Sequence, residues 1–157
     1  MRSHEAWSAE RAAEIIGERR GEEGAALPIL HALQEVFGHV PEAAVPMLAE
    51  ALNLSRAEIH GVVTFYHDFR REPAGRHVLK LCRAEACQSM GSERLAARAE
   101  AKLGIAGAGT TEDGGVTLEP VYCLGLCALA PSAMLDGRVV GRLDEMRLDA
   151  LLQEAGR

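Results

Sequence analysis

Four cysteines are the residues of this chain best suited to chemistry, and they occur as two close pairs. Cys82 and Cys87 have four residues between them in "LCRAEACQSM", Cys123 and Cys127 have three in "VYCLGLCALAP", and 35 residues separate the two pairs. Thiolates bind zinc, hold iron–sulfur clusters and carry out disulfide exchange. The spacing therefore indicates a metal centre or a redox site built from two separate loops.

Three kinds of site compete for these thiols. Structural zinc usually takes cysteines two residues apart, sometimes up to four, so both pairs are admissible for zinc without being typical. Disulfide exchange favours Cys-x-x-Cys at the start of a helix, and neither pair has that spacing. A two-iron cluster needs two thiolates on each iron and accepts wider loops. The residues favour the iron–sulfur interpretation, with zinc second and redox or unligated thiols third.

Each pair would have to pass around one iron, so we expect the residues inside each pair to form a turn rather than a helix or strand. In the second pair Gly125 can adopt a positive φ and let backbone N–H groups approach sulfur. Leu124 and Leu126 would add apolar cover that limits the access of water. These features make "CLGLC" well suited to an iron–sulfur loop.

Histidines offer a weaker alternative set of ligands. A Rieske arrangement would replace two cysteines with histidines. The nearest candidates, His60, His67 and His77, lie in neither cysteine loop. We therefore interpret each of them as an ordinary surface or core histidine.

Composition and charge exclude several classes of function. The net charge of −6 disfavours broad electrostatic attraction to nucleic acid or to an anionic membrane. The first residues, "MRSHEAWSAERAAEII", are charged throughout and do not resemble a signal peptide. The longest weakly polar stretch, Cys123–Leu135, is too short to span a bilayer. We expect a soluble, cytoplasmic protein without a membrane span, and in a reducing compartment four cysteines are better explained as ligands or redox groups than as disulfides.

The part of the chain before the cysteines predicts four helices. Ser8 can cap the first, Pro28 stands in the first turn of the second with Gly38 after its end, Pro41 opens the third, and Ser55 with Glu58 has capping-box spacing for the fourth. The expected buried positions, helix by helix, are Ala12, Ile15 and Ile16; Leu30, Leu33 and Phe37; Val45, Leu48 and Leu52; and Ile59, Val62, Val63 and Tyr66. Residues 1–72 are therefore predicted to form a helical module.

The composition changes near residue 72, and the pattern of residues 73–157 predicts an α/β domain. "RHVLKLC" alternates polar and apolar residues like a strand, and "SMGSERLAARAEAKLG" is typical of a helix with Leu95 and Leu103 inward. Residues 104–115 are expected to be a loop. "GVTLEPVYC" predicts a second strand, which Pro120 makes an edge strand or one with an irregular end.

The last part of the chain predicts a hairpin and a closing helix. Asp-Gly between two apolar runs in "SAMLDGRVVGRL" is a strong hairpin signal. The helix that follows starts near Asp144, and its expected apolar face consists of Met146, Leu148, Leu151 and Leu152. This order of strands and helices is typical of a thioredoxin-like half-domain.

Taken together, these motifs resemble those of the thioredoxin-like [2Fe-2S] ferredoxin family. The resemblance rests on Cys-x4-Cys and Cys-x3-Cys about 35 residues apart, on "CLGLCALAP", on the "GVVTFYHDFR" segment and on "LPILHALQEVFGHVPEAAVPMLAEALNL". The family includes the ferredoxin-type small subunit of respiratory NADH dehydrogenase, the matching subunits of NAD-reducing hydrogenases, and the gamma subunit of NAD-dependent formate dehydrogenases. "CRAEACQSMGSERL" and "DGRVVGRLD" look closest to the formate dehydrogenase subunits.

The resemblance implies a site, a cofactor and partners. Cys82 and Cys87 would bind one iron of a [2Fe-2S] cluster, and Cys123 and Cys127 the other. The resemblance implies a partner, a larger flavin subunit with FMN, an NAD(H) site and its own iron–sulfur centre. No Gly-rich dinucleotide fingerprint follows a strand in this chain, so we expect NAD to bind that partner. The helical module would be the docking surface. In a formate dehydrogenase, a molybdenum or tungsten subunit would oxidise formate.

The resulting expectation is an α/β protein whose four-helix module precedes a thioredoxin-like [2Fe-2S] domain. It would be an electron-transfer subunit of a NAD-dependent formate dehydrogenase complex, and it would need no acid–base or nucleophilic group of its own. Two alternatives remain: the equivalent subunit of complex I or of a hydrogenase, and a zinc-stabilised interaction module. Pro131 follows the second cysteine loop where thioredoxin-like folds often have a cis bond, although base rates favour the trans form.

Overall fold

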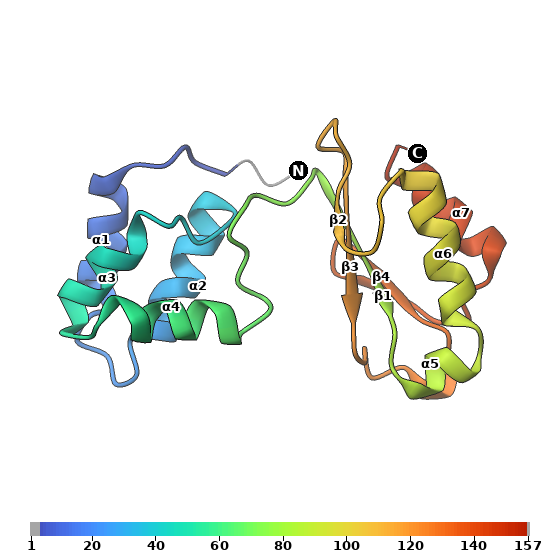
Figure 1. Ribbon diagram of the computed structural model, residues 1–157, viewed down its shortest axis with the longest axis horizontal. Helices are drawn as coiled ribbons and strands as arrows, with labels where there is room; N and C mark the ends of the chain where they lie inside the picture. Colours follow the sequence, from blue (N-terminus) through green and yellow to red (C-terminus); the bar gives the residue numbers. More distant parts are fainter. Residues whose placement is uncertain (1–3, 157) are drawn as a thin grey trace. The chain divides into compact units, whose positions relative to one another are not determined.

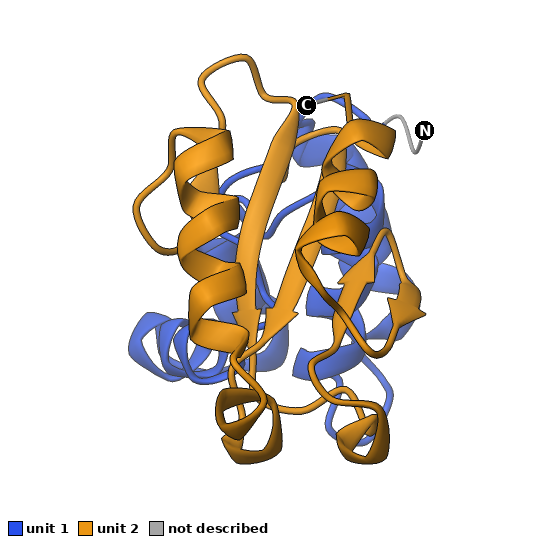
Figure 2. Cartoon of the chain, turned by 90° about the vertical axis from the view of Figure 1, so that its right-hand side faces the viewer, with its two compact units in different colours: residues 1–73 blue, residues 74–157 orange. Residues whose placement is uncertain are grey.

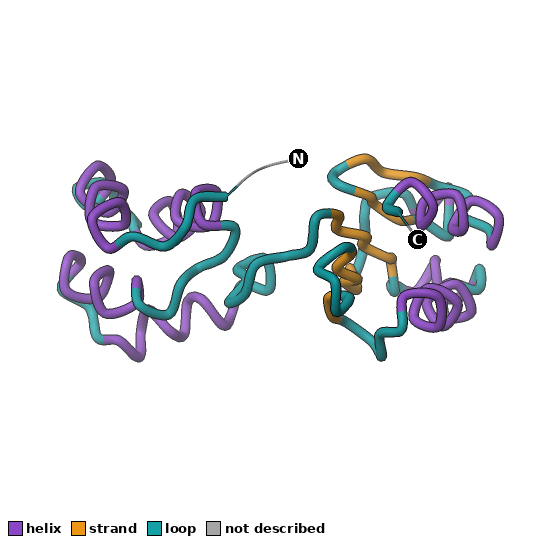
Figure 3. The backbone as a smooth tube through the Cα atoms, turned by 90° about the horizontal axis from the view of Figure 1, so that it is seen from above, coloured by secondary structure: helices purple, strands orange, loops and turns teal. Residues whose placement is uncertain are grey.

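The structure is a computed structural model that describes residues 4–156, and the chain divides into two compact units. Unit 1 is Met1–Pro73 and unit 2 is Ala74–Arg157 (Figure 2). Within the described residues, helices make up the regular structure of unit 1, whereas all the strands belong to unit 2 (Figure 3). No helix in residues 4–156 is both long enough and apolar enough to cross a membrane.

Unit 1 consists of four helices whose ends follow from local sequence signals. They are α1 (Ala9–Arg19), α2 (Ala26–Phe37), α3 (Ala44–Leu52) and α4 (Arg56–Phe65). The Ser8 hydroxyl accepts a hydrogen bond from the Arg11 N–H and caps α1. Gly38 ends α2 in the left-handed conformation, with φ of 78°. Ser55 and Glu58 form the predicted capping box at the start of α4.

The core of unit 1 lies between these helices, since α1 packs on α2 and α3, and α3 packs on α4. Its most deeply buried residues include Ala12, Ile29, Leu30, Leu33, Leu48 and Ile59. The predicted inward faces are confirmed for α1 and α2. The prediction is wrong for Tyr66, which is 44% exposed. The reason is that α4 ends at Phe65 and Tyr66 has an extended backbone, so helical periodicity no longer sets its direction.

Unit 2 combines a five-stranded sheet with helices. Along the chain its elements are β1 (His77–Cys82), α5 (Glu85–Ser89), α6 (Ser92–Leu103), β2 (Gly109–Thr110), β3 (Val116–Val121), the 3₁₀ turn η1 (Cys127–Leu129), β4 (Ala133–Leu135), β5 (Arg138–Val140) and α7 (Glu145–Glu154). The strand order is β2-β3-β1-β4-β5, and only the β1–β3 pair is parallel. Helices α6 and α7 pack together beside the sheet (Figure 1). The predicted α/β class, with four helices before the first strand, is confirmed.

Of the two possibilities predicted for β3, an edge strand or one with an irregular end, the edge position is wrong because β3 lies between β2 and β1. Pro120 is tolerated there because β2 is only two residues long and pairs with Thr117 and Leu118. Pro120 therefore lies beyond the β2 pairing, where its missing N–H breaks no bond to that strand. The short β2 strand itself falls in a region that was expected to be a loop.

The closing hairpin and helix form as the sequence predicts. Asp136 and Gly137 join β4 to β5 with φ of 51° and 89°, the two positive values that a tight Asp-Gly hairpin turn requires. Asp144 caps α7 through the Arg147 N–H. The apolar face of α7 is confirmed for Leu148, Leu151 and Leu152, which enter the core of unit 2. The prediction is wrong for Met146, which is 76% exposed in the first turn of α7.

Candidate metal centre

The two cysteine loops meet because the strands before them run parallel. Cys82 is the last residue of β1 and pairs with Val121, the last residue of β3. The carboxyl ends of parallel neighbours lie at the same edge of a sheet, so the segments that follow them start side by side. Figure 2 shows this edge at the bottom of unit 2, where the short helical turns α5 and η1 lie beyond the strand arrowheads. The pairing of β1 with β3 thus brings together two cysteine pairs that lie far apart in the sequence.

The first pair is buried, and part of its loop is helical. Cys82 and Cys87 are each 2% exposed, and Cys87 lies within α5, which starts at Glu85. The expectation that only a turn lies inside this pair is therefore wrong. Ser132 joins both cysteines: its hydroxyl lies 3.6 Å from Cys87 Sγ, and its carbonyl accepts the Cys82 N–H at 3.0 Å. The pair is thus fixed from the start of β4 as well as from β1.

The surroundings shift the pKa values of the two buried thiols in opposite directions. Burial works to raise the pKa of Cys82, but hydrogen bonds from the Ala84 N–H, Cys87 and Ser132 lower it overall. Burial raises the pKa of the Cys87 thiol, and its contact with Cys82 adds to that effect. Cys82 is therefore the thiol of this pair that is better prepared to be a thiolate, the form in which cysteine binds metals.

The second pair lies in an exposed, strained turn. Cys123 and Cys127 are exposed, and their sulfur atoms are 3.7 Å apart. Cys123 has φ of 123° and Gly125 has φ of 74°. A non-glycine residue with positive φ is uncommon, and such residues concentrate at functional sites. As predicted for this loop, the Gly125 N–H approaches sulfur and donates to Cys123 Sγ at 3.3 Å. Contact with Cys123 raises the pKa of the Cys127 thiol.

The two pairs influence each other across the edge of the sheet. The N–H of Leu124, inside the second loop, forms a hydrogen bond that contributes to lowering the pKa of Cys82 in the first. Cys87 and Cys82 also contribute electrostatically to raising the pKa of Cys127. The second cysteine loop therefore contacts the first, and the two pairs lie close enough to affect each other's acidity.

The second pair has the sulfur spacing that two ligands of one tetrahedral metal require. Two thiolates at about 2.3 Å from a tetrahedral metal lie about 3.8 Å apart, close to the 3.7 Å between Cys123 and Cys127 sulfurs. Within residues 4–156, no three His, Cys, Asp or Glu side chains converge closely enough to share one metal ion. A [2Fe-2S] cluster asks for two thiolates at each iron rather than four at one point, which agrees with two separate pairs.

The histidines considered as alternative ligands stay outside the two cysteine loops. His60 lies on the exposed side of α4 and His67 just beyond it, both in unit 1. His77 starts β1, at the opposite end of that strand from Cys82, and its Nδ1 lies 2.7 Å from the Asp136 carboxylate. The contact with Asp136 supports the interpretation of His77 as an ordinary histidine, and His60 and His67 are exposed side chains, as expected for surface histidines.

Two residues near the cysteines differ from expectation or were not foreseen. The Ala130–Pro131 bond is cis, so the base-rate expectation of a trans bond is wrong. Ser132, which contacts both cysteines of the first pair, was missed because nothing in its local sequence marks it. Its position directly after the second cysteine loop was the only available signal.

The fold and this site define a class: an α/β domain with two cysteine pairs at the carboxyl edge of a parallel strand pair. The model of the thioredoxin-like [2Fe-2S] ferredoxin family matches residues 12–156. The chain belongs to that family, and the family resemblance seen in the sequence is confirmed.

The relatives are subunits of larger redox enzymes. The chain is 40% identical over 129 residues to the E 2 subunit of NADH-quinone oxidoreductase from Rhizobium meliloti, covering 82% of this chain and 77% of the relative. It is 35% identical to the E subunit of NADH-quinone oxidoreductase from Escherichia coli K12, covering 82% and 78%. It is 30% identical to the HndA subunit of NADP-reducing hydrogenase from Solidesulfovibrio fructosivorans, covering 84% and 77%.

A solved structure has a similar fold. A chain of NAD+-reducing [NiFe]-hydrogenase, in the H2-reduced state, superposes with a TM-score of 0.68 and 28% identity over 81% of this chain. The match spans only 22% of that hydrogenase chain. The similarity therefore concerns one part of a larger protein.

Proposed function

We propose that this chain is an electron-transfer subunit that holds one [2Fe-2S] cluster. Cys82 and Cys87 would bind one iron, and Cys123 and Cys127 the other. In this proposal residues 73–157 are the cluster-binding domain and residues 1–72 the module that docks a partner. The chain works in the cytoplasm beside a subunit that carries FMN and binds NAD(H).

One observation supports the proposal above the others. The parallel pairing of Cys82 with Val121 brings two cysteine loops together that are 35 residues apart in the chain. Family membership supplies the kind of cluster, and the 3.7 Å between the Cys123 and Cys127 sulfurs suits two ligands on one iron. A zinc-stabilised module would need four ligands around one ion, and membership of a [2Fe-2S] family favours the iron–sulfur cluster over it.

The bound cluster would supply one-electron chemistry, accepting and releasing a single electron. The residues of this chain would determine how that happens. Burial of Cys82 and Cys87 keeps water from one half of the site, whereas the exposed Cys123 and Cys127 leave the other half accessible. The Gly125 N–H, which donates to Cys123 Sγ, would stabilise negative charge on that sulfur.

Metal and sulfide analysis with cysteine variants tests the proposal. The full chain, purified without air and reconstituted if necessary, should contain iron and acid-labile sulfide in a ratio of about two to two. Changing each of the four cysteines to serine should abolish or alter the visible absorption and the reduced-state EPR signal. Ser89→Ala is a matched control, because Ser89 ends the same short helix α5 that contains Cys87 and its hydroxyl donates to the Ala86 carbonyl instead. Helical circular dichroism should be retained, since the cysteines lie outside unit 1.

Two outcomes would overturn this function. One zinc per chain, with no iron or sulfide after reconstitution, would support the interaction module. Unchanged absorption and EPR in all four serine variants would show that these cysteines are not the ligands.

The identity of the assembly forms a separate part of the proposal. The relatives named above are subunits of NADH-quinone oxidoreductases and of a hydrogenase, which favours the complex I or hydrogenase alternative over the formate dehydrogenase suggested by "CRAEACQSMGSERL". We therefore propose an NADH-quinone oxidoreductase or hydrogenase type of complex. A partner with a molybdenum or tungsten site that oxidises formate is the less supported assignment.

Isolation of the tagged full chain from its native cell distinguishes these assemblies. A flavin subunit that co-purifies with quinone oxidoreductase or hydrogenase subunits supports our assignment, whereas a co-purifying molybdenum or tungsten subunit supports formate dehydrogenase. Phe65 and Tyr66, exposed at the end of α4, make the helical module a reasonable docking surface. Phe65→Ala should then reduce the yield of the flavin subunit, and an unchanged yield would contradict docking through this part of unit 1.

A further inference from the structure

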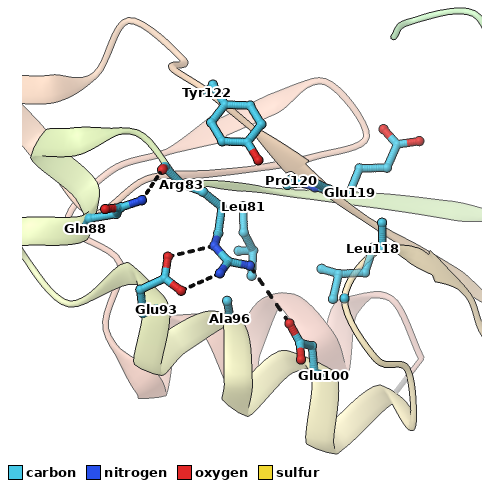
Figure 4. Close-up of a pocket in the computed structure, with 12 residues that line it drawn as sticks. Leu81, Arg83, Gln88, Glu93, Ala96, Glu100, Leu118, Glu119, Pro120 and Tyr122 are labelled. Carbon is cyan, nitrogen blue, oxygen red and sulfur yellow. Dashed lines mark hydrogen bonds and ion pairs between the residues drawn. The ribbon is translucent and has the colours of Figure 1, made fainter. Parts of the chain in front are cut away.

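Arg83 follows Cys82 directly and forms an ion-pair cluster with two carboxylates of α6 (Figure 4). Its Nε donates to Glu93 Oε1 at 2.8 Å, and its Nη2 pairs with the second oxygen of the same carboxylate. This two-point contact is the strong geometry for a guanidinium and a carboxylate. Arg83 Nη1 lies 4.0 Å from Glu100 Oε1. We call Arg83, Glu93 and Glu100 the Arg83 cluster.

The backbone of Arg83 also joins the two cysteine loops. Its N–H donates to the Val121 carbonyl at 2.8 Å, two residues before Cys123. Its carbonyl accepts a hydrogen bond from Gln88 Nε2 at 2.9 Å, and Gln88 follows Cys87. Arg83 is therefore tied to the segments that carry both cysteine pairs, and its charge has a fixed place beside them.

The surroundings keep this charge partly away from water. The Arg83 side chain is 30% exposed and lines a cavity of about 210 Å³ together with Glu93, Glu100 and Tyr122, the residue before Cys123. Charges in such partly shielded places are screened less than fully exposed ones. A change in the balance of the Arg83 cluster should therefore be felt at the neighbouring cysteines.

We propose that the Arg83 cluster sets the electrostatic potential at the cysteine site and thereby tunes the reduction potential of the group held there. The inference rests on the proposed function. Adding an electron makes the site more negative, so a nearby positive charge favours reduction and a nearby negative charge opposes it. In the native chain Glu93 compensates the charge of Arg83 through the two-point contact. This compensation keeps the reduction potential between the value expected with the positive charge alone and the value expected with the negative charges alone. Arg83 and Glu93 act as positioning residues, since neither is assigned as a ligand.

The proposal predicts opposite shifts from two variants of one ion pair. Glu93→Gln removes the two-point contact of the Arg83 cation, leaves it only the 4.0 Å contact with Glu100, and should raise the reduction potential. Arg83→Gln leaves Glu93 and Glu100 uncompensated and should lower it. The double variant Arg83→Gln/Glu93→Gln should return towards the wild-type value. If the variants only damaged the loop, the shift in reduction potential would have no reason to change sign with the charge that is removed. The signs of the shifts therefore distinguish electrostatic tuning from structural damage.

Redox titration of the reconstituted full chain, followed by visible absorption, measures these shifts. We expect each single variant to change the equilibrium constant for one-electron reduction about three- to tenfold, or about 30 to 60 mV for a one-electron couple. The shifts should shrink at high salt, because the Arg83 cluster is only partly shielded. Iron content and EPR line shape should stay those of the wild type.

Glu154→Gln is the matched control. Glu154 is 57% exposed, similar to Glu93 at 53%, and it pairs with Arg138 at 2.5 Å. It is the last residue of α7, which ends near the C-terminus and away from α5 (Figure 1). Glu154→Gln removes one negative charge, as Glu93→Gln does, but it should leave the reduction potential unchanged.

The possible results are distinct. Shifts of opposite sign in Arg83→Gln and Glu93→Gln, with none in Glu154→Gln, would support the tuning role. Three results would overturn the tuning role while the [2Fe-2S] cluster remains intact. They are unchanged potentials, shifts of the same sign in both variants, or an equal shift in Glu154→Gln. A wild-type protein without iron and sulfide would overturn the proposed function, and this inference with it.

Discussion

Replacement of Gly141 by alanine should strain the second cysteine loop through one added methyl group. Gly141 lies between β5 and α7, and a Cβ at this position would lie 2.7 Å from Leu129 Cβ and 3.1 Å from the Leu129 carbonyl oxygen. Leu129 ends η1, which begins at Cys127. The φ of Gly141 is not in the positive region, so the change tests close packing rather than backbone strain.

The size of the effect follows from the overlap and from how firmly Leu129 is held. Carbon atoms in contact prefer about 3.5–4.0 Å, so the new methyl group requires a movement of about 1 Å. The Leu129 carbonyl accepts the Arg142 N–H at 2.5 Å, and its N–H donates to the Leu126 carbonyl at 2.8 Å. Overpacking against such fixed atoms costs about 1–3 kcal/mol. We expect the free energy of unfolding to fall by that amount.

Urea and thermal unfolding of the full chain measure this loss. For a chain of this size each kcal/mol lowers the melting temperature by about 2–4 °C. Gly61→Ala is the control, because Gly61 lies inside α4, has no positive φ, and has nothing within 4 Å of the place that an alanine methyl group would take. Alanine should stabilise a helix interior by about 0.5–1 kcal/mol, the opposite sign.

The reasoning would be refuted by a Gly141→Ala protein as stable as the wild type while Gly61→Ala shows its expected gain. That result would mean that the segment after β5 relaxes away from Leu129 without loss. It would also mean that this segment does not brace the loop that contains Cys127.

Three further predictions concern the stability of each unit. Ser55→Ala removes the cap of α4 and should cost about 1 kcal/mol in urea unfolding; no loss would show that the cap is dispensable. Leu79→Ala, at a fully buried position of β1, should cost about 2–5 kcal/mol, and a loss below about 1 kcal/mol would contradict the close packing of that core. Hydrogen bonds from Arg98 and Lys102 hold the pKa of Asp149 well below its ordinary value of 3.8. Because the folded-state pKa is depressed, the stabilisation is present above pH 3.8 and is lost as the pH falls below it. The difference in free energy of unfolding between wild type and Asp149→Asn should therefore shrink in acid. A difference that does not depend on pH would disprove this.

Local signals made most of the helices predictable. Ser8, Gly38 and the capping box of Ser55 with Glu58 act through hydrogen bonds or backbone preferences within a few residues, so they can be recognised directly in the sequence. The Asp136–Gly137 turn is of the same kind. The errors at Tyr66 and Met146 occur where a local pattern was extended past the end of an element or onto its exposed first turn.

The amino-acid sequence by itself determined which side chains are available for the site: two pairs of cysteines, a glycine that allows a turn around sulfur, and a spacing characteristic of one family. The tertiary structure decided which groups surround them. Ser132 reaches Cys87, and Arg83 reaches Glu93, only because β1 pairs with β3 and β4 and lies beside α6. Contacts of this kind depend on strand pairing and packing between segments far apart in the chain. The residues next to each cysteine do not indicate which distant segments will pair, so these contacts could not be predicted from the sequence.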